Sequence, residues 1–265
     1  MIFGMEYAFS RLELLYGKKA LMTLKGKRVA VFGVGGVGGY VIEALARSAI
    51  GEIDVIDNDV FTPSNLNRQL LATVSTIGRS KVDVAEERIH SINPECVVHK
   101  HAHFYLPSDP GDIDFTKFDY IVDAIDTMSA KIDIITKAKE LGIPIISSMG
   151  CGNRLDPTKL RVADIYETSM DPLSKIIRRE CRKRGIQSLR VVYSIEEVTR
   201  PIRPIPQAPL GQEKTKRRKD TPGSSAFVPS VAGLLLASVV TNELSQYQKS
   251  RLEAMGELSE KEKEK

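Results

Sequence analysis

Apolar residues in the first sixty positions form two short runs separated by a helical pattern. Val29–Phe32 is one run, and the second covers residues 53–56 and ends at Asp57. Between them, apolar residues recur at helical spacing over residues 41–46. Short apolar runs predict buried strands, whereas a period of 3.6 predicts a helix. The pattern therefore predicts a β-strand, an α-helix and a second β-strand in one unit.

The same alternation continues to about residue 150. Helical spacing covers residues 8–24, 81–92 and 127–141, and short strand-like runs cover residues 97–99, 118–125 and 143–147. Alternating strands and helices are typical of an α/β fold with a parallel sheet. We therefore expect a Rossmann-like, mostly parallel sheet with flanking helices.

The pattern changes in the second half of the chain. Strand-like runs at Leu160–Ile165 and Val191–Ile195 flank a helical pattern at Leu173–Arg184, and an apolar helix follows at Phe227–Tyr247. We predict that these strands continue the sheet as an antiparallel extension. Residues 200–226 have no period and are rich in proline and charge, which predicts a mobile loop.

Length and composition are those of an ordinary globular protein. The 265 residues are 42% hydrophobic and 27% charged, with a net charge of +4. We predict one domain over residues 1–249, with a nucleotide half to about residue 150 and a substrate half over 151–249. A charged tail covers residues 250–265. The three cysteines are far apart, which excludes a tetrathiolate zinc site.

The pattern predicts neither secretion nor a membrane span. The first fifteen residues lack a basic segment followed by an apolar core. The longest apolar run, Val231–Val240, is about half of the ~20 residues that cross a bilayer. We expect a cytoplasmic protein without integral membrane association, whose apolar C-terminal helix could lie peripherally at a membrane.

The turn after the first strand is rich in glycine and fits G-x-G-x-x-G. Its glycines are Gly33, Gly35, Gly36 and Gly38. Such glycines permit a tight turn, backbone approach to a phosphate and close packing of helix on strand. Asp57 follows where a ribose-binding acid is expected. The turn predicts a nucleotide site without identifying the nucleotide, and a purely structural glycine turn is the alternative.

Polar residues are concentrated directly after the second strand. The stretch contains Asp59, Asn65, Arg68 and Gln69. It follows a strand at the carboxyl edge of the sheet, where open α/β folds bind ligands. Asn and Gln can contact a ribose or base, and the planar arginine fork can hold a phosphate. We predict nucleotide contacts here, with a capped polar loop as the alternative.

Two further charged positions lie at the ends of predicted elements. Lys81 falls in the first turn of a helix, where the helix dipole favours acidic side chains. A lysine at this position is expected if it faces a bound anion such as a phosphate. The alternative is an exposed surface lysine. Asp123 and Asp126 end a buried strand. A carboxylate there suits Mg²⁺ bound to a nucleotide triphosphate. The alternative is that both acids cap the following helix.

Cys151 lies in a second glycine-rich turn, Met149–Gly152. A cysteine in such a turn could be a nucleophile, but small buried cysteines are commoner. The sequence also places no histidine to activate it. We predict that Cys151 is not required for catalysis.

Basic residues gather in two clusters of the second half. The clusters are Lys175, Arg178, Arg179, Arg182, Lys183 and Arg184, and then Lys214, Lys216, Arg217, Arg218 and Lys219. Clustered cations are the footprint expected for a nucleic-acid backbone. The alternative is that they only keep the protein soluble.

The order of motifs in the first half resembles the E1-like adenylating superfamily. The motifs are GVGGVG, DNDVFTPSNLNRQ, GRSK and DAIDT. The resemblance implies an adenylation domain that uses ATP and Mg²⁺ to adenylate a carboxylate. In that case the glycines approach the phosphates, Asp57 holds the ribose and Asp126 holds Mg²⁺. The residues that would grip the phosphates are Asn65, Arg68 and Lys81.

The resemblance also assigns a role to Arg11. In FSRLELLYG, Arg11 matches an N-terminal arginine that reaches the ATP of the partner subunit in a homodimer. Ala8 stands where the superfamily usually has a second arginine. The resemblance thus implies a homodimer in which Arg11 acts across the interface.

The second half resembles the tRNA-modifying dehydratases of this superfamily. The motifs are DPLSKIIRRECRKRG, VVYSIE and GSSAFVPSVAGLLLAS. This resemblance implies a tRNA substrate, whose N6-threonylcarbamoyladenosine at position 37 is closed into its cyclic form, and leaves open a sulfur-transfer protein partner. The alternatives are activation of a ubiquitin-like sulfur carrier, an NAD-dependent dehydrogenase and an RNA-binding module.

Overall fold

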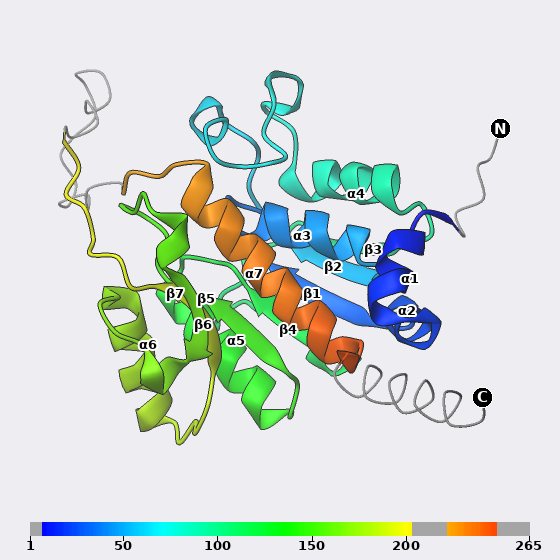
Figure 1. Ribbon diagram of the computed structural model, residues 1–265. Helices are drawn as coiled ribbons and strands as arrows, with labels where there is room; N and C mark the ends of the chain where they lie inside the picture. Colours follow the sequence, from blue (N-terminus) through cyan, green and yellow to red (C-terminus); the bar gives the residue numbers. More distant parts are fainter. Residues whose placement is uncertain (1–6, 203–221, 248–265) are drawn as a thin grey trace, which may run out of the picture.

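The computed structural model describes residues 7–202 and 222–247. Seven strands form one sheet in the order β3-β2-β1-β4-β5-β7-β6 (Figure 1). Their bounds are Arg28–Phe32 (β1), Glu52–Ile56 (β2), Val97–His101 (β3), Tyr120–Asp123 (β4), Ile145–Ser148 (β5), Leu160–Asp164 (β6) and Arg190–Ser194 (β7). Every neighbouring pair is parallel except β6 and β7, which are antiparallel. The predicted α/β class, including the antiparallel extension, is confirmed.

Helices cover both faces of the sheet. They are Ser10–Tyr16 (α1), Lys18–Lys25 (α2), Gly38–Arg47 (α3), Lys81–Ile92 (α4), Met128–Glu140 (α5), Pro172–Lys183 (α6) and Phe227–Leu244 (α7). One core lies between the sheet and α3, α4 and α7, and the second lies between the sheet and α5 and α6. Figure 1 shows α7 lying across the sheet beside α3. Strands from both halves of the chain thus belong to one sheet, and α7 packs against strands of both halves.

The first predicted helix is wrong in one respect. Residues 8–24 do not form a single helix, because the chain breaks at Gly17 between α1 and α2. Gly17 has φ 83° and ψ 158°, a conformation that side chains on other residues disfavour. The apolar spacing continues through the break, so periodicity alone does not reveal it.

Helix α7 is apolar because it is part of the core. Val228, Ala232, Leu236 and Val240 are each fully buried and recur every four residues. By length and composition α7 would be able to cross a membrane, but half of it is buried inside the protein, as in a core helix. Peripheral membrane contact stays a prediction.

Two predicted segments fall mainly outside the described residues. Of the predicted loop 200–226, residues 203–221 are not described, and these include the second basic cluster. The predicted tail 250–265 is also outside. The division into halves stays a prediction.

Gly233 sets the distance between α7 and α3. A Cβ at this position would lie 2.4 Å from the Val37 carbonyl oxygen and 2.8 Å from Tyr40 Cβ. We expect Gly233→Ala to lower the free energy of unfolding by about 1–3 kcal/mol, as in overpacked cores. Urea denaturation would measure this.

Ser238→Ala, at an exposed position of the same helix, is the control and should change stability by less than about 0.5 kcal/mol. A Gly233→Ala protein as stable as the parent would contradict the close approach.

Candidate nucleotide-binding site

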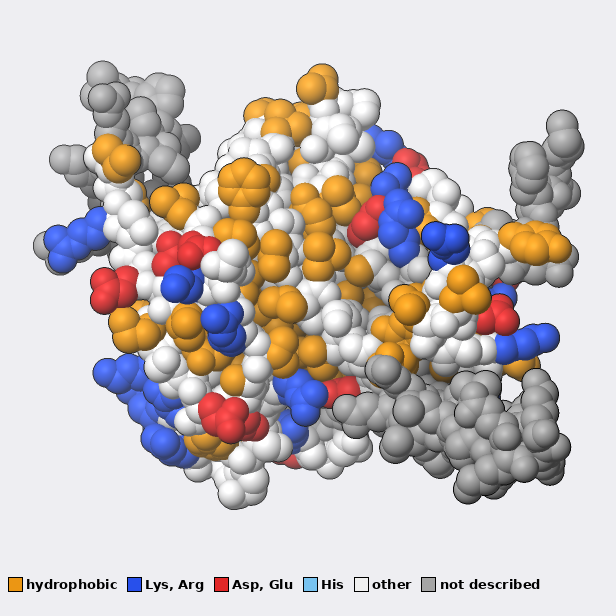
Figure 2. All heavy atoms as spheres, in the orientation of Figure 1, with side chains coloured by type: hydrophobic (Ala, Val, Ile, Leu, Met, Phe, Trp, Pro, Cys, Tyr) orange, Lys and Arg blue, Asp and Glu red, His pale blue; other side chains and the backbone are white. Residues whose placement is uncertain are grey.

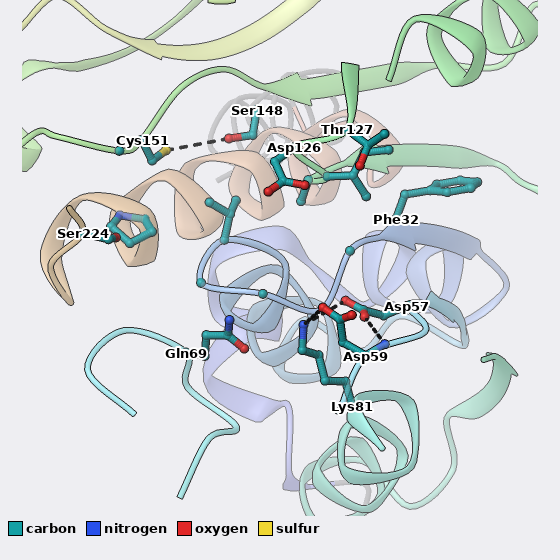
Figure 3. Close-up of a pocket in the computed structure, with 18 of the residues that line it drawn as sticks. Phe32, Asp57, Asp59, Gln69, Lys81, Asp126, Thr127, Ser148, Cys151 and Ser224 are labelled. Atoms are coloured by element: carbon teal, nitrogen blue, oxygen red, sulfur yellow. Dashed lines mark hydrogen bonds and ion pairs between the residues drawn. The ribbon is translucent and has the colours of Figure 1, made fainter. Parts of the chain in front are cut away.

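A cavity of about 560 Å³ opens at the carboxyl ends of β1, β2, β4 and β5 (Figure 3). Strands β1 and β4 are neighbours, yet the chain leaves them toward opposite edges of the sheet. Such a reversal point is where open α/β folds bind ligands. Most of the predicted site residues line this cavity: Gly33, Gly35, Gly36, Asp57, Asp59, Asn65, Arg68, Gln69, Lys81 and Asp126.

The glycine-rich turn joins β1 to α3, and at two of its glycines there is no room for a side chain. A Cβ on Gly38 would lie 1.7 Å from the Gly33 carbonyl oxygen, and one on Gly33 would lie 2.8 Å from the Ala124 carbonyl oxygen. Gly35 is different, because the nearest atom to its Cβ position is Gln69 Nε2 at 3.9 Å. Its open side faces the cavity, and no side chain caps the N-terminus of α3. Such a turn can hold an anion on free N–H groups.

Asp57 and Lys81 meet at the wall of the cavity (Figure 3). Asp57 Oδ2 accepts from the Val34 N–H at 2.7 Å, and its Oδ1 accepts from the Asp59 N–H at 2.9 Å. Lys81 Nζ lies 3.5 Å from Asp57 Oδ2 and 2.8 Å from Asp59 Oδ2. Lys81 is only 4% exposed. It is therefore a buried cation at the cavity and not a surface lysine.

The polar stretch after β2 also faces the cavity. Asn65 Oδ1 accepts from the Thr62 N–H at 3.0 Å and so caps a short 3-10 helix. Arg68 donates to the Ser64 carbonyl at 2.8 Å. Gln69 is 8% exposed, and its Oε1 is buried without a hydrogen-bond partner among the described residues. Because an unpaired buried acceptor is costly, Gln69 suits a ligand that donates a hydrogen bond.

The two acids after β4 separate into different roles. Asp123 is buried and bonds to Lys131, whereas Asp126 is exposed to the cavity without a partner in the described chain. No group of three or more His, Cys, Asp or Glu residues in the described ranges would hold a metal ion by itself. Mg²⁺ typically takes one or two carboxylates and completes its shell with phosphate oxygens and water. Asp126 fits that chemistry only together with a bound nucleotide.

Lys131 is a site residue that the sequence did not reveal. It is fully buried in α5, and its Nζ lies 2.7 Å from Asp123 Oδ2, 3.2 Å from Ser147 Oγ and 3.0 Å from the Ser148 carbonyl oxygen. These contacts tie the end of β4 to the end of β5, beneath two loops that line the cavity. Its position eight residues after Asp123, in the first turn of α5, is the signal that could have suggested the pair.

Arg154 has a similar role on the next turn. It is 2% exposed, donates to the Gly150 carbonyl at 3.1 Å and pairs with Asp171 Oδ2 at 2.9 Å. Asp171 Oδ1 accepts from the Ser174 N–H at 2.6 Å and so caps α6. The turn that contains Cys151 is therefore held against the start of α6.

Cys151 has no activating base among its observed partners. Its Sγ lies 3.7 Å from the Met149 carbonyl oxygen and 3.9 Å from Ser148 Oγ. Burial raises the pKa of the Cys151 thiol to about 11. A thiol with that pKa carries very little thiolate at neutral pH.

Arg11 is not among the residues that line its own cavity. It is exposed on α1, which packs at the C-terminal end of α7 through a 2.6 Å hydrogen bond from Tyr16 to Asn242. The cavity touches the other end of α7, at Pro229. An 18-residue helix is about 27 Å long. Arg11 therefore lies on a helix that packs at the far end of α7 from the cavity of the same subunit.

The basic helix α6 begins at the cavity, where Leu173 forms part of the wall. Arg178 is half-buried and donates to the Thr168 carbonyl at 2.6 Å, so it has a structural role. The other predicted cations of this helix and the turn after it remain exposed: Lys175, Arg179, Arg182, Lys183 and Arg184. One of the two predicted basic clusters is thus an exposed surface, carried by a helix whose N-terminal end lines the cavity.

A parallel sheet, a glycine-rich first turn, an acid at the end of β2 and buried cations at one edge define a nucleotide-binding α/β protein. The ThiF family matches residues 9–262, and the chain belongs to this family. It is 44% identical over 243 residues to the tRNA threonylcarbamoyladenosine dehydratase of Bacillus subtilis, covering 91% of this chain and 95% of that protein.

Solved structures and a more distant relative extend the comparison. Crystal structures of the Escherichia coli tRNA N6-threonylcarbamoyladenosine dehydratase with AMP and with ATP have TM-scores of 0.80 and 0.78 and 29% identity, covering 93% of this chain and 96% of theirs. A Vanderwaltozyma polyspora adenylyltransferase and sulfurtransferase is 34% identical over 137 residues, 52% of this chain and 31% of that protein. The similarity to the dehydratases is therefore the more extensive one.

The raised pKa of Cys151 predicts slow alkylation. Because only the thiolate reacts, the rate with iodoacetamide should rise about tenfold per pH unit from pH 7 to 9, where an ordinary thiol of pKa about 8.5 would level off. Peptide mass spectrometry of the labelled protein would measure the rate. A rate that is already maximal near pH 7 would show an activated thiol instead.

Proposed function

We propose that this protein uses ATP to dehydrate N6-threonylcarbamoyladenosine in tRNA to its cyclic form. The cavity supports the proposal because it places an open glycine turn, the buried Lys81 and the unpartnered Asp126 around one space. The B. subtilis relative that matches nearly the whole chain is named for this reaction. The E. coli dehydratase has been crystallised with ATP and with AMP.

The first step is adenylation of the nucleoside carboxylate. A carboxylate oxygen attacks the α-phosphorus of ATP, the bond to the bridging oxygen of the β-phosphate breaks, and pyrophosphate leaves. Negative charge builds on the leaving pyrophosphate, so cations held in a water-poor site stabilise the transition state. In this proposal Lys81 and Arg68, which line the cavity, supply that charge, and the N-terminus of α3 offers N–H groups to the phosphates.

The second step closes the ring. The carbamoyl group of the same nucleoside attacks the acyl adenylate, and AMP leaves with the oxygen that belonged to the carboxylate. The nucleoside has then lost one water in total. Because the second nucleophile is part of the substrate, the protein needs no covalent intermediate, which agrees with the unreactive thiol of Cys151.

Mg²⁺ is the metal that this site suits. When bound to the ATP phosphates, it would neutralise their charge, and Asp126 is the residue that would hold it. In the same proposal Asp57 holds the ribose, and Gln69 Oε1 accepts a hydrogen bond from the nucleotide.

A homodimer would give Arg11 a role. Arg11 is exposed and does not line its own cavity, so it would act on the ATP of a second copy. Exposed apolar side chains on α1, α2 and α7 suit an interface, and Figure 2 shows apolar side chains gathered along the face that carries α7. Those exposed beyond 40% on α1, α2 and α7 are Leu14, Leu15, Met22, Phe227 and Leu234.

The exposed cations of α6 suit the phosphate backbone of tRNA, because they begin beside the cavity. The alternative substrate, a ubiquitin-like sulfur carrier, is favoured by a relative that matches only about half of this chain. The sulfur-transfer protein partner and the cytoplasmic location stay predictions.

The reaction can be tested directly. Incubation with ATP and tRNA that carries N6-threonylcarbamoyladenosine should yield the cyclic nucleoside, detected by mass spectrometry of the digested tRNA. Asp126→Ala should reduce turnover by more than about 100-fold, because a charge-stabilising group is lost. Cys151→Ser should retain turnover within about threefold. Normal turnover in Asp126→Ala, or near-total loss in Cys151→Ser, would contradict these assignments.

Complementation tests whether Arg11 acts across a dimer. Arg11→Ala and Lys81→Ala should each be inactive alone. In a mixed dimer, the subunit with intact Lys81 receives the intact Arg11 of its partner, so one of its two sites is restored. Mixing the variants after mild dissociation should therefore recover roughly a quarter of wild-type activity. No recovery in a mixture with proven subunit exchange would place Arg11 in its own subunit's site or in none.

A further inference from the structure

The two sides of the cavity differ in charge. In Figure 3, Asp57 and Lys81 lie on one side, and Cys151 and Ser224 lie on the other. The second side is lined by neutral groups: Gly150, Cys151, Gly152, Pro222 and Ser224. In a displacement at the α-phosphate, the attacking and leaving oxygens are roughly in line. If Lys81 on the charged side holds the leaving pyrophosphate, the neutral side is left for the incoming carboxylate.

Residues 222–225 form the outer part of the neutral side, and they are bonded to both halves of the chain. The Gly223 N–H donates to Asn153 Oδ1 at 2.6 Å, and the Asn153 N–H donates to the Gly223 carbonyl at 2.7 Å. From the nucleotide half, Asn67 Nδ2 donates to the Ser224 carbonyl at 2.9 Å. The segment thus bridges the stretch after β2 and the turn after β5.

Hydrogen bonds hold this segment more than packing does. Pro222 and Gly223 are exposed, and Ser224 and Ser225 are only half-buried. Without buried side chains, the local stability of a segment depends on its few hydrogen bonds. Its fit against the turn after β5 is nevertheless close, since a Cβ on Gly152 would lie 2.8 Å from Pro222 Cβ.

Asn153 has a backbone conformation that suits an anchor. Its φ is 58°, in the left-handed region where asparagine is more frequent than most other residues with a side chain. In this conformation its N–H and Oδ1 both bond to Gly223, and its carbonyl accepts from the Thr199 N–H at 2.8 Å. All of these groups serve to hold neighbouring loops.

We infer that residues 222–225 form the wall that positions the acceptor carboxylate. Asn153 and Asn67 are the positioning residues that hold this wall. The inference rests on the proposed adenylation. The acceptor is the anionic side chain of the modified nucleoside. Loosening the wall weakens binding of the acceptor tRNA. ATP affinity is unaffected by the loss of Asn153, because Asn153 bonds to Gly223 and Thr199 and not to the residues assigned to the phosphates and ribose.

Asn153→Gly is the discriminating variant. It removes the Oδ1 acceptor, while glycine keeps a positive φ without strain. Hydrogen exchange at the amides of residues 223–225 should become at least about tenfold faster. The KM for tRNA that carries N6-threonylcarbamoyladenosine should rise about fivefold, as expected for one lost hydrogen bond. The Kd for ATP, measured by equilibrium dialysis, should stay within about twofold.

Gln246→Gly is the matched control. Gln246 also has a positive φ, 52°, but it is exposed and follows α7 at the end away from the cavity. It should change neither the exchange of residues 223–225 nor the tRNA KM.

Asn67→Ala tests the second anchor. It should raise the tRNA KM in the same direction. Because both anchors hold one segment, the Asn67→Ala/Asn153→Gly double variant should raise KM by less than the product of the single effects. Its ATP affinity is not diagnostic, since Asn67 Oδ1 also accepts from Arg68 at 3.0 Å.

Unchanged exchange in Asn153→Gly would show that Asn153 does not hold the segment. Faster exchange with an unchanged tRNA KM, or with an equal rise in the ATP Kd, would show that the segment does not position the acceptor. Either result overturns the inference. A wild-type protein that forms no cyclic nucleoside would instead count against the proposed function, while the exchange measurement would still test the anchor.

Discussion

The position of the nucleotide site depends on the approach of the Gly33 carbonyl to Gly38. A Cβ on Gly38 would lie 1.7 Å from that oxygen, so only glycine lets α3 begin directly after β1. The N-terminus of the helix then faces the cavity, where its N–H groups and dipole favour an anion. Asp57 is bonded to the Val34 N–H of the same turn at 2.7 Å. One backbone contact thus places both the open glycine turn and Asp57 at the cavity.

Buried ion pairs hold the other half of the cavity. Lys131 with Asp123 joins the ends of β4 and β5, and Arg154 with Asp171 joins the turn after β5 to α6. A buried charge left without its partner is strongly destabilising, so these pairs keep the loops in one arrangement. Because the loops carry Asp126 and Cys151, the pairs connect the core to the wall of the cavity.

Much of the fold was predictable because strands and helices have different hydrophobic periods. The break at Gly17 was not, since the apolar spacing continues on both sides of it. In the site, the glycines and Asp57 were predictable from local spacing. Arg154 and Asp171, 17 residues apart, were not, because a pairing between distant residues leaves no periodic signal.

By itself the sequence determined the α/β class, the glycine turn and the set of polar residues at one sheet edge, because each depends on neighbours in the chain. Only the tertiary structure decided which polar residues form buried ion pairs and which line the cavity. Asp123 forms a buried ion pair with Lys131, whereas Asp126 lines the cavity, although the two acids are only three residues apart. Burial on all sides gave Asp123 a lysine partner, whereas the turn beyond β4 left Asp126 open to a ligand. That difference arises from packing in three dimensions, which no local pattern records.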